Sequence, residues 1–314
     1  MIIEQSKLEK KHDWSSSEIN RWADYIELLC IKQESISTDE VIEEWMEFDF
    51  ENESARGESD HSLKMDKFSA RVADYYRILE SRQKICGEYY PFEVKDGNYL
   101  HFIGISDRKK EKYIYLLLCS SISFMSSYHE YTNSFEKLCK LLMIELSPKD
   151  TIVELFGTSR EACFFVGSLR ERIKQLAKCL GTETTKRFDK EERFDSIFGG
   201  DGGIDIVAFT PIDEAGFIPF SFSQCTCSYD KWKDKQTSIG EELWNSYVEL
   251  GVHYAQYMFV PFSCHNSRGK FCNETRIKTY LIDRLRIIKL IEKEGFKTEE
   301  FEKLYSFINM EDII

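Results

Sequence analysis

Two polar residues, Asp205 and Gln224, lie within short apolar segments of the sequence and have the chemistry to bind a divalent cation. The pattern predicts a strand over residues 204–209 and an antiparallel partner over residues 217–227. Side chains alternate between the two faces of a strand, so Asp205 and Gln224 can converge on one point between neighbouring strands. A carboxylate in an apolar strand costs free energy of desolvation, which calls for a functional reason. Because carboxylate and amide oxygens bind hard cations, the pair is a candidate site for Mg²⁺ or Mn²⁺.

The segments around this pair resemble a known nuclease family. Residues 199–209 (GGDGGIDIVAF) and 221–225 (SFSQC) are similar to the core of the PD-(D/E)xK superfamily, especially its Mrr-type restriction endonuclease branch. The resemblance covers about residues 130–265 and implies an α/β fold with a restriction-endonuclease-like αβββα core. It assigns Asp205 to the strand aspartate of the family and Gln224 to its Glu/Gln position. The implied activity is Mg²⁺-dependent hydrolysis of phosphodiester bonds, with DNA as the favoured substrate, in restriction or anti-phage defence.

The family lysine is absent from its usual place, because Thr226 stands there. In some members of the superfamily this lysine comes from the following helix. Ser228 and the two residues after it can cap such a helix, on which Lys231 and Lys235 share a face. We prefer Lys235, since Lys231 lies at the frayed start of the helix. Lys235 would position the attacking water or help to deprotonate it, provided that its surroundings lower its pKa.

An acidic residue from the first helix of the core has two candidates, Glu136 and Glu171. Phe135-Glu136 resembles the start of that helix in the family, and a predicted strand over 151–156 follows it. Glu136 can equally complete a capping box with Asn133. Glu171 lies on a predicted helix over 159–180, closer in sequence to the Asp205 strand. We prefer Glu136, which makes the 159–180 helix an insertion between strands.

Other predicted elements place these residues in the second of two domains. Residues 1–125 form a mostly helical docking or sensing region, and residues 126–314 form the nuclease domain. The first region has predicted helices over 15–31 and 66–84, another from residue 38, and a strand-rich stretch over 89–124. After Gln224 the pattern predicts a helix over 240–250, a strand over 254–262 and a helix over 275–294. Asp201, before the Asp205 strand, suits a glycine-rich turn better than an outer-sphere ligand role.

Charge is distributed unevenly along the 314 residues. The 42 Lys and Arg against 55 Asp and Glu give a net charge of −13, which argues against a uniformly basic surface. Residues 33–60 contain eleven acidic residues and one arginine. This segment is either a solvated helix face or a surface for a protein partner or self-association. Residues 267–290 contain seven Lys and Arg, which either follow a phosphate backbone or form a solvated face.

The ten cysteines are scattered through apolar segments, which is typical of free thiols in a reducing cytosol. We find no signal peptide, and the most apolar stretch, residues 113–124, is too short to cross a bilayer, so we expect a cytoplasmic protein without a membrane partner. A zinc-stabilised adaptor is disfavoured because the available ligands lack standard spacing. A Cys–His hydrolase has no supporting local signature. The candidate zinc ligands are Cys225, Cys227, Cys264, His265 and Cys272.

The main alternative to an enzyme is an interaction subunit of a multi-protein defence complex that keeps the nuclease fold without its chemistry. Thr226 at the lysine position and the uncertain replacement lysine favour this alternative. Cleavage of DNA by the parent protein and by an Asp205 variant distinguishes the two hypotheses.

Overall fold

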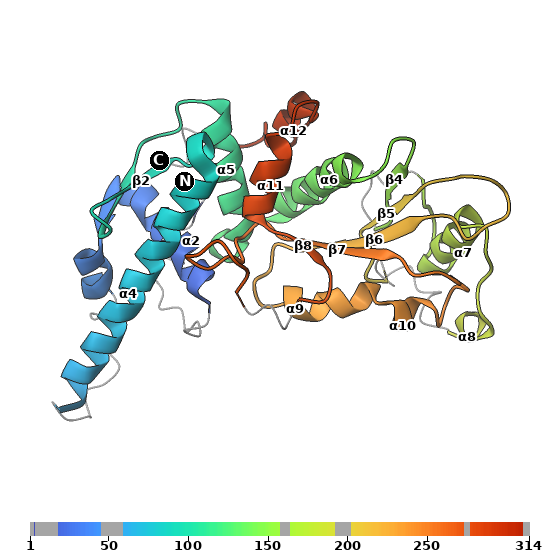
Figure 1. The fold of residues 1–314 in the computed structure, drawn as a ribbon, viewed down its shortest axis with the longest axis horizontal. Helices are drawn as coiled ribbons and strands as arrows, with labels where there is room; N and C mark the ends of the chain where they lie inside the picture. The colour runs from blue at the N-terminus through green and yellow to red at the C-terminus, as the bar shows by residue number, and fades with distance from the viewer. Residues whose placement is uncertain are drawn as a thin grey trace. The chain divides into compact units, whose positions relative to one another are not determined.

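The computed structural model describes residue 3 and residues 18–44, 59–157, 164–191, 202–272 and 277–309, without the side chains of residues 59–64. The chain is an α/β protein with two compact units (Figure 1). The first unit comprises Met1–Tyr128, Phe262–Cys272 and Tyr305–Ile314, and the second comprises His129–Pro261 and Asn273–Leu304. The sequence pattern predicts one boundary near residue 125. In the structure two later segments also group with the first unit.

The first unit combines helices with a small antiparallel sheet. Its strands follow the order β1-β3-β2, and β3 pairs with both neighbours. The predicted helices over 15–31 and 66–84 correspond to α2 and α4, and the helix from residue 38 is described as far as residue 44. The elements are α2 (Ile19–Gln33), β1 (Ser35–Ser37), α4 (Ser59–Cys86), η1 (Gly87–Tyr89), β2 (Phe92–Lys95), β3 (Tyr99–Phe102), α5 (Arg108–Ser120) and η2 (Ile122–Phe124).

The strand-rich prediction for residues 113–124 was wrong, because this stretch contains helix α5 followed by η2. Asp107 caps α5, and its side chain accepts hydrogen bonds from the backbone amides of Lys109 (2.9 Å) and Lys110 (3.1 Å). Every residue from Lys112 to Ser120 is buried. A helix buried on all sides has a continuous apolar sequence, which lacks the 3.6-residue period that identifies surface helices.

Replacing Asp107 with alanine is expected to destabilise the first unit by about 1 kcal/mol at pH 7, through loss of the cap. A hydrogen bond from the Lys110 ammonium holds the pKa of Asp107 at about 2, below the 3.8 of an ordinary aspartate. Because the folded-state pKa is lowered, the contribution of the charged carboxylate is present above pH 3.8 and is lost as the pH falls toward 2. Urea unfolding at several pH values measures this. Asp107→Asn keeps a capping oxygen, and a loss equal to that of Asp107→Ala would contradict the assignment.

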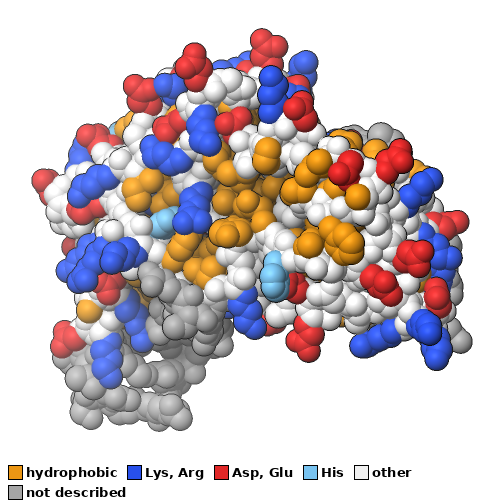
Figure 2. Space-filling model, turned by 45° about the vertical axis from the view of Figure 1, so that its right-hand side comes forward, with side chains coloured by type: hydrophobic (Ala, Val, Ile, Leu, Met, Phe, Trp, Pro, Cys, Tyr) orange, Lys and Arg blue, Asp and Glu red, His pale blue; other side chains and the backbone are white. Residues whose placement is uncertain are grey.

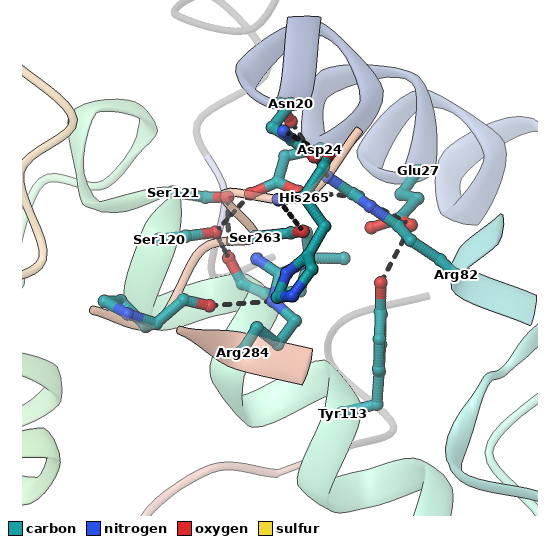
Figure 3. A network of polar contacts seen from close by, with 12 residues as sticks. Asn20, Asp24, Glu27, Arg82, Tyr113, Ser120, Ser121, Ser263, His265 and Arg284 are labelled. Atoms are coloured by element: carbon teal, nitrogen blue, oxygen red, sulfur yellow. Dashed lines mark hydrogen bonds and ion pairs between the residues drawn. The ribbon is translucent and has the colours of Figure 1, made fainter. Parts of the chain in front are cut away.

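A buried network of ion pairs and hydrogen bonds joins α2 to α4 and α5 (Figure 3). The Arg82 guanidinium lies 2.7 Å from a carboxylate oxygen of Asp24 and 2.8 Å from one of Glu27. The Glu27 carboxylate also accepts hydrogen bonds from the hydroxyls of Tyr90 and Tyr113, each at 2.9 Å. All of these side chains are buried. Helix α2, which was predicted from the spacing of its apolar residues, therefore also buries two charged side chains, Asp24 and Glu27.

The second unit has a five-stranded sheet in the order β4-β5-β6-β7-β8. Neighbours among β4, β5 and β6 are antiparallel, whereas β7 is parallel to β6, and β8 is parallel to β7. In Figure 1 α6 and α11 lie on one side of this sheet, and α9 and α10 lie on the other. The helices are α6 (His129–Leu146), α7 (Leu169–Cys179), α8 (Lys186–Asp189), α9 (Trp232–Lys235), η4 (Gln236–Ile239), α10 (Glu241–Trp244), α11 (Arg284–Ile291) and α12 (Thr298–Leu304). The strands are β4 (Ile152–Leu155), β5 (Ile206–Phe209), β6 (Phe220–Cys225), β7 (Ala255–Phe259) and β8 (Tyr280–Ile282).

The predicted pairing of the Asp205 and Gln224 segments is confirmed. Val207 pairs with Phe222 and Phe209 with Phe220, as the alternation of side chains requires. These side chains belong to the hydrophobic core on one face of the sheet, which also contains Trp244. On the other face the Ser223 hydroxyl lies 3.6 Å from the sulfur of Met143 in α6. The β5–β6 pair thus lies between two layers of the second unit.

Two predicted helices near the C-terminus are shorter than expected. The helix predicted over 240–250 is reduced to the four residues of α10, and the segment predicted as a helix over 275–294 begins with strand β8. Buried Asp283 caps α11 by accepting a hydrogen bond from the backbone amide of Arg286, so this helix starts only at Arg284. The strand before the cap extends the sheet by pairing with β7.

Candidate active site

Asp205 lies directly before β5 and connects this strand to the end of β6. One carboxylate oxygen, Oδ2, accepts hydrogen bonds from the backbone amide of Cys225 (2.6 Å) and from Nε2 of Gln224 (2.5 Å). Asp205 is 7% exposed and Gln224 is 2% exposed. Two residues 19 positions apart thus meet in a buried contact. Since Asp205 also satisfies the Cys225 amide, its carboxylate helps to hold the strand pair together.

The carboxamide of Gln224 has a defined orientation. Its nitrogen lies between Oδ2 of Asp205 and the carbonyl oxygen of Cys225, which is 3.3 Å away. Its oxygen accepts a hydrogen bond from the Ser238 hydroxyl at 3.2 Å. The carboxamide nitrogen therefore faces two oxygen atoms, those of Asp205 and Cys225, and the carboxamide oxygen faces the Ser238 hydroxyl.

Glu136 lies inside α6, because the helix begins at His129. The predicted capping box with Asn133 is therefore wrong, since Asn133 is not at the start of the helix. Cys139, one turn further along α6, forms a hydrogen bond with the thiol of Cys225. Burial, above all, raises the pKa of Cys225 well above its ordinary value, and the negative charges of Asp205 and Glu136 act in the same direction. The Cys225 thiol lies on the face of β6 that α6 covers, whereas the Gln224 side chain points to the opposite face, toward Ser238.

Glu171, the alternative helix acid, stabilises the start of α7. Its carboxylate accepts hydrogen bonds from the backbone amide (2.6 Å) and the hydroxyl (3.0 Å) of Ser168, and the Ser168 hydroxyl accepts from the Glu171 amide. The bond from the Ser168 amide is the main reason why the pKa of Glu171 is lowered. Glu171 therefore forms a capping box with Ser168, and its carboxylate is hydrogen-bonded at the start of α7.

The two candidate lysines differ in burial. Lys235 ends α9 and is half-buried, whereas Lys231 precedes α9 and is exposed. The Ser238 hydroxyl lies 2.7 Å from the carbonyl oxygen of Lys235 as well as near Gln224. The backbone of Lys235 is therefore connected to the Gln224 carboxamide through one side chain. No motif or periodicity marks Ser238, and only its contacts in the folded chain reveal it.

The residues around Asp205 have the donor chemistry for Mg²⁺. The Asp205 carboxylate, the Gln224 carboxamide and the Cys225 carbonyl can each offer oxygen atoms, which hard cations prefer. Within the described part of the chain, no three His, Cys, Asp or Glu side chains form a metal-binding group. A cation here must therefore use the amide and main-chain oxygens as well. The residues fit Mg²⁺ if the Gln224 carboxamide turns over, since its nitrogen now faces Asp205.

The cysteines do not gather into a metal site among the described residues. Cys225 and Cys227 belong to the second unit and are buried, whereas Cys264 and Cys272 belong to the first. The raised pKa keeps Cys225 a neutral thiol, a poor ligand and a poor nucleophile. These positions favour neither the zinc adaptor nor the Cys–His hydrolase.

Of the basic residues predicted over 267–290 to follow a phosphate backbone or form a solvated face, only Arg284 among those described is buried, and Arg286 and Lys289 on α11 are exposed. Arg284 is fully buried, and its Nε donates to the Pro261 carbonyl at 2.7 Å. Arg286 donates to the Leu281 carbonyl, and the Lys289 ammonium pairs with Glu292 at 2.8 Å. On the face in Figure 2, hydrophobic side chains gather near the middle of the view, and basic and acidic side chains lie mostly around them. Arg276, Asp201 and residues 45–58 of the acidic segment lie outside the described residues.

Comparison with protein-family models, curated proteins and solved structures finds no match to this chain. No described helix has both the length and the apolar composition that spanning a membrane would require. The function of the chain is therefore inferred from its own residues and their geometry.

Proposed function

We propose that the second unit is a metal-dependent nuclease domain of the PD-(D/E)xK type, which hydrolyses phosphodiester bonds in nucleic acid, with DNA as the favoured substrate. The observation that carries the proposal is the buried contact of Asp205 with Gln224 at the end of β6. The element order supports it, because α6, β4, β5, β6 and α9 follow one another as in an αβββα core. Helices α7 and α8 are then an insertion between β4 and β5. We assign docking or sensing in a restriction or defence system to the first unit, through a protein partner or self-association.

Each proposed site residue has a distinct part in this chemistry. A bound Mg²⁺ would stabilise charge on the scissile phosphate and lower the pKa of the attacking water. Asp205, the Gln224 oxygen and the Cys225 carbonyl would hold the ion. Lys235 orients the attacking water and balances the charge of the phosphate. Because Gln224 is neutral at a position where the family pattern also allows glutamate, the ion is bound only weakly without substrate.

A non-catalytic interaction subunit is the second candidate function. It is favoured by the hydrogen bonds of Asp205, whose Oδ2 is satisfied by Gln224 and the Cys225 amide without a cation. Thr226 in place of the motif lysine points in the same direction. In that case the fold would serve assembly of a defence complex.

A cleavage assay separates the two functions. The full-length chain is incubated with circular plasmid DNA, single-stranded DNA and RNA in Mg²⁺ or Mn²⁺. The nuclease proposal expects cleavage of at least one substrate, and EDTA abolishes it. An absence of cleavage with every substrate and both metals would favour the interaction subunit.

Replacing Lys235 with methionine is expected to lower the cleavage rate about 10²-fold, as loss of a group that assists proton transfer does. The matched control is Lys231→Met, which makes the same change at an exposed lysine directly before α9 and should leave the rate unchanged. Single-turnover cleavage of the same substrate measures both variants. Equal cleavage rates for the two variants would show that Lys235 has no role in the site.

A further inference from the structure

The Gln224 carboxamide nitrogen lies where a cation would be expected in this site. It contacts Oδ2 of Asp205 at 2.5 Å and the Cys225 carbonyl at 3.3 Å, and both of these oxygens belong to the proposed set of metal ligands. The hydrogens on an amide nitrogen carry partial positive charge, so they interact with oxygen lone pairs as a cation does. The carboxamide therefore satisfies the two oxygens in the absence of metal, and it must turn over before its own oxygen can join them.

Ser238 contacts the other end of the carboxamide. Its hydroxyl lies 3.2 Å from Oε1 of Gln224, 2.7 Å from the Lys235 carbonyl and 3.0 Å from the Gly203 carbonyl. A hydroxyl donates one hydrogen and also accepts, so it can serve either end of an amide. In the present orientation it can donate to Oε1. In the reversed orientation it can accept from Nε2 and donate instead to the carbonyl of Lys235 or Gly203.

The position of Ser238 depends on a glycine. A Cβ atom added at Gly203 would clash with the Cβ of Ser238, and the φ of Gly203 is +88°. No larger residue fits there without displacing the η4 segment. The close packing of this segment against the turn before β5 holds the hydroxyl next to Gln224.

We propose that Ser238 is a positioning residue that allows the Gln224 carboxamide to reverse when a divalent cation binds. Without the cation, Nε2 faces Asp205. With the cation, Oε1 faces the ion and Nε2 donates to Ser238, so no buried polar group loses its partner. This inference rests on the proposed metal site and adds the residue that makes a neutral glutamine a usable ligand.

The test measures Mn²⁺ binding to the full-length chain by electron paramagnetic resonance. Ser238→Ala is expected to weaken Mn²⁺ binding about tenfold, because the reversed Nε2 then lacks an acceptor. Thr237→Ala is the matched control, since the Thr237 hydroxyl is exposed and donates to the Asp234 carbonyl, and its affinity should equal that of the parent. In a Gln224→Glu background Ser238→Ala should change affinity less than twofold, because both ends of a carboxylate are oxygen. Thermal unfolding verifies that each variant is folded.

The side-chain amide of Gln224 provides an independent signal. Its ¹⁵N–¹H resonances are expected to shift on addition of Mg²⁺ in the parent and to shift less in Ser238→Ala. If the parent binds no Mn²⁺ at millimolar concentration, the proposed metal site and this inference both fail. If the parent binds Mn²⁺ and folded Ser238→Ala binds it equally well, the role of Ser238 alone is refuted and the metal site remains.

Discussion

Replacing Asp205 with asparagine is expected to lower the rate of Mg²⁺-dependent cleavage about 10³-fold. The substitution keeps the size of the side chain and removes the negative charge of a proposed metal ligand. Stabilisation of phosphate charge by a metal amounts to several kcal/mol, and each 1.36 kcal/mol corresponds to a factor of ten in rate. The introduced asparagine can still accept a hydrogen bond from the Cys225 amide through its remaining oxygen, so the β5–β6 pair should persist. Single-turnover cleavage with saturating Mg²⁺ gives the rate.

The matched control for this variant is Asp213→Asn. Asp213 is an exposed residue of the loop between β5 and β6, and its carboxylate accepts a hydrogen bond from the Ala215 amide at 2.8 Å. This control carries the same charge change on the same hairpin and should cleave at the parental rate. Circular dichroism and thermal unfolding check that both variants are folded. Parental activity in folded Asp205→Asn would rule out the proposed site.

Replacing Arg82 with methionine is expected to destabilise the first unit by about 3–5 kcal/mol, the usual cost of removing one partner from a buried ion pair. The Arg82 side chain is 1% exposed, and those of Asp24 and Glu27 are 4% and 0% exposed. Without the guanidinium, two buried carboxylates lose the cation that they share. Denaturant unfolding measures the loss, and hydrogen exchange of the α2 and α4 amides locates it in this unit.

Two further variants test the assignment of this cost to buried charge. Arg77→Met, on the same helix, removes an exposed arginine whose partner Asp74 is also exposed, and should cost less than about 1 kcal/mol. Adding Glu27→Gln to Arg82→Met removes one of the two buried negative charges and should recover part of the stability. If Arg82→Met and Arg77→Met cost the same, the network does not hold the first unit together.

The central hairpin of the candidate site was predictable from sequence. Alternating side chains are a local property of a strand, so the face shared by Val207 and Phe222 and the meeting of Asp205 with Gln224 could be inferred from spacing alone. The order of α6, β4 and α7 before this hairpin was also predicted, whereas strand β8 after it was not. The register of the pair agrees with the predicted faces, since Val207 lies opposite Phe222 and Phe209 lies opposite Phe220.

The helix–strand error at residues 113–124 has a different origin. Residues 113–119 of α5 are all hydrophobic and buried, and an unbroken apolar stretch is compatible with a buried strand or a buried helix. The capping box predicted at Asn133 and Glu136 was wrong for a related reason. Asn133 and Glu136 have suitable spacing, yet α6 starts at His129, whereas Ser168 and Glu171 form the actual box.

The amino-acid pattern was sufficient for the strands of the hairpin and for the residue types that could bind a hard cation. Folding added the contacts between distant segments: Ser238 against Gln224 and Gly203, and Arg82 against Asp24 and Glu27. Periodicity reports which face of an element is apolar, since burial repeats along the chain. The partner of a buried polar group has no such repeat, because it depends on how elements far apart in sequence pack in three dimensions.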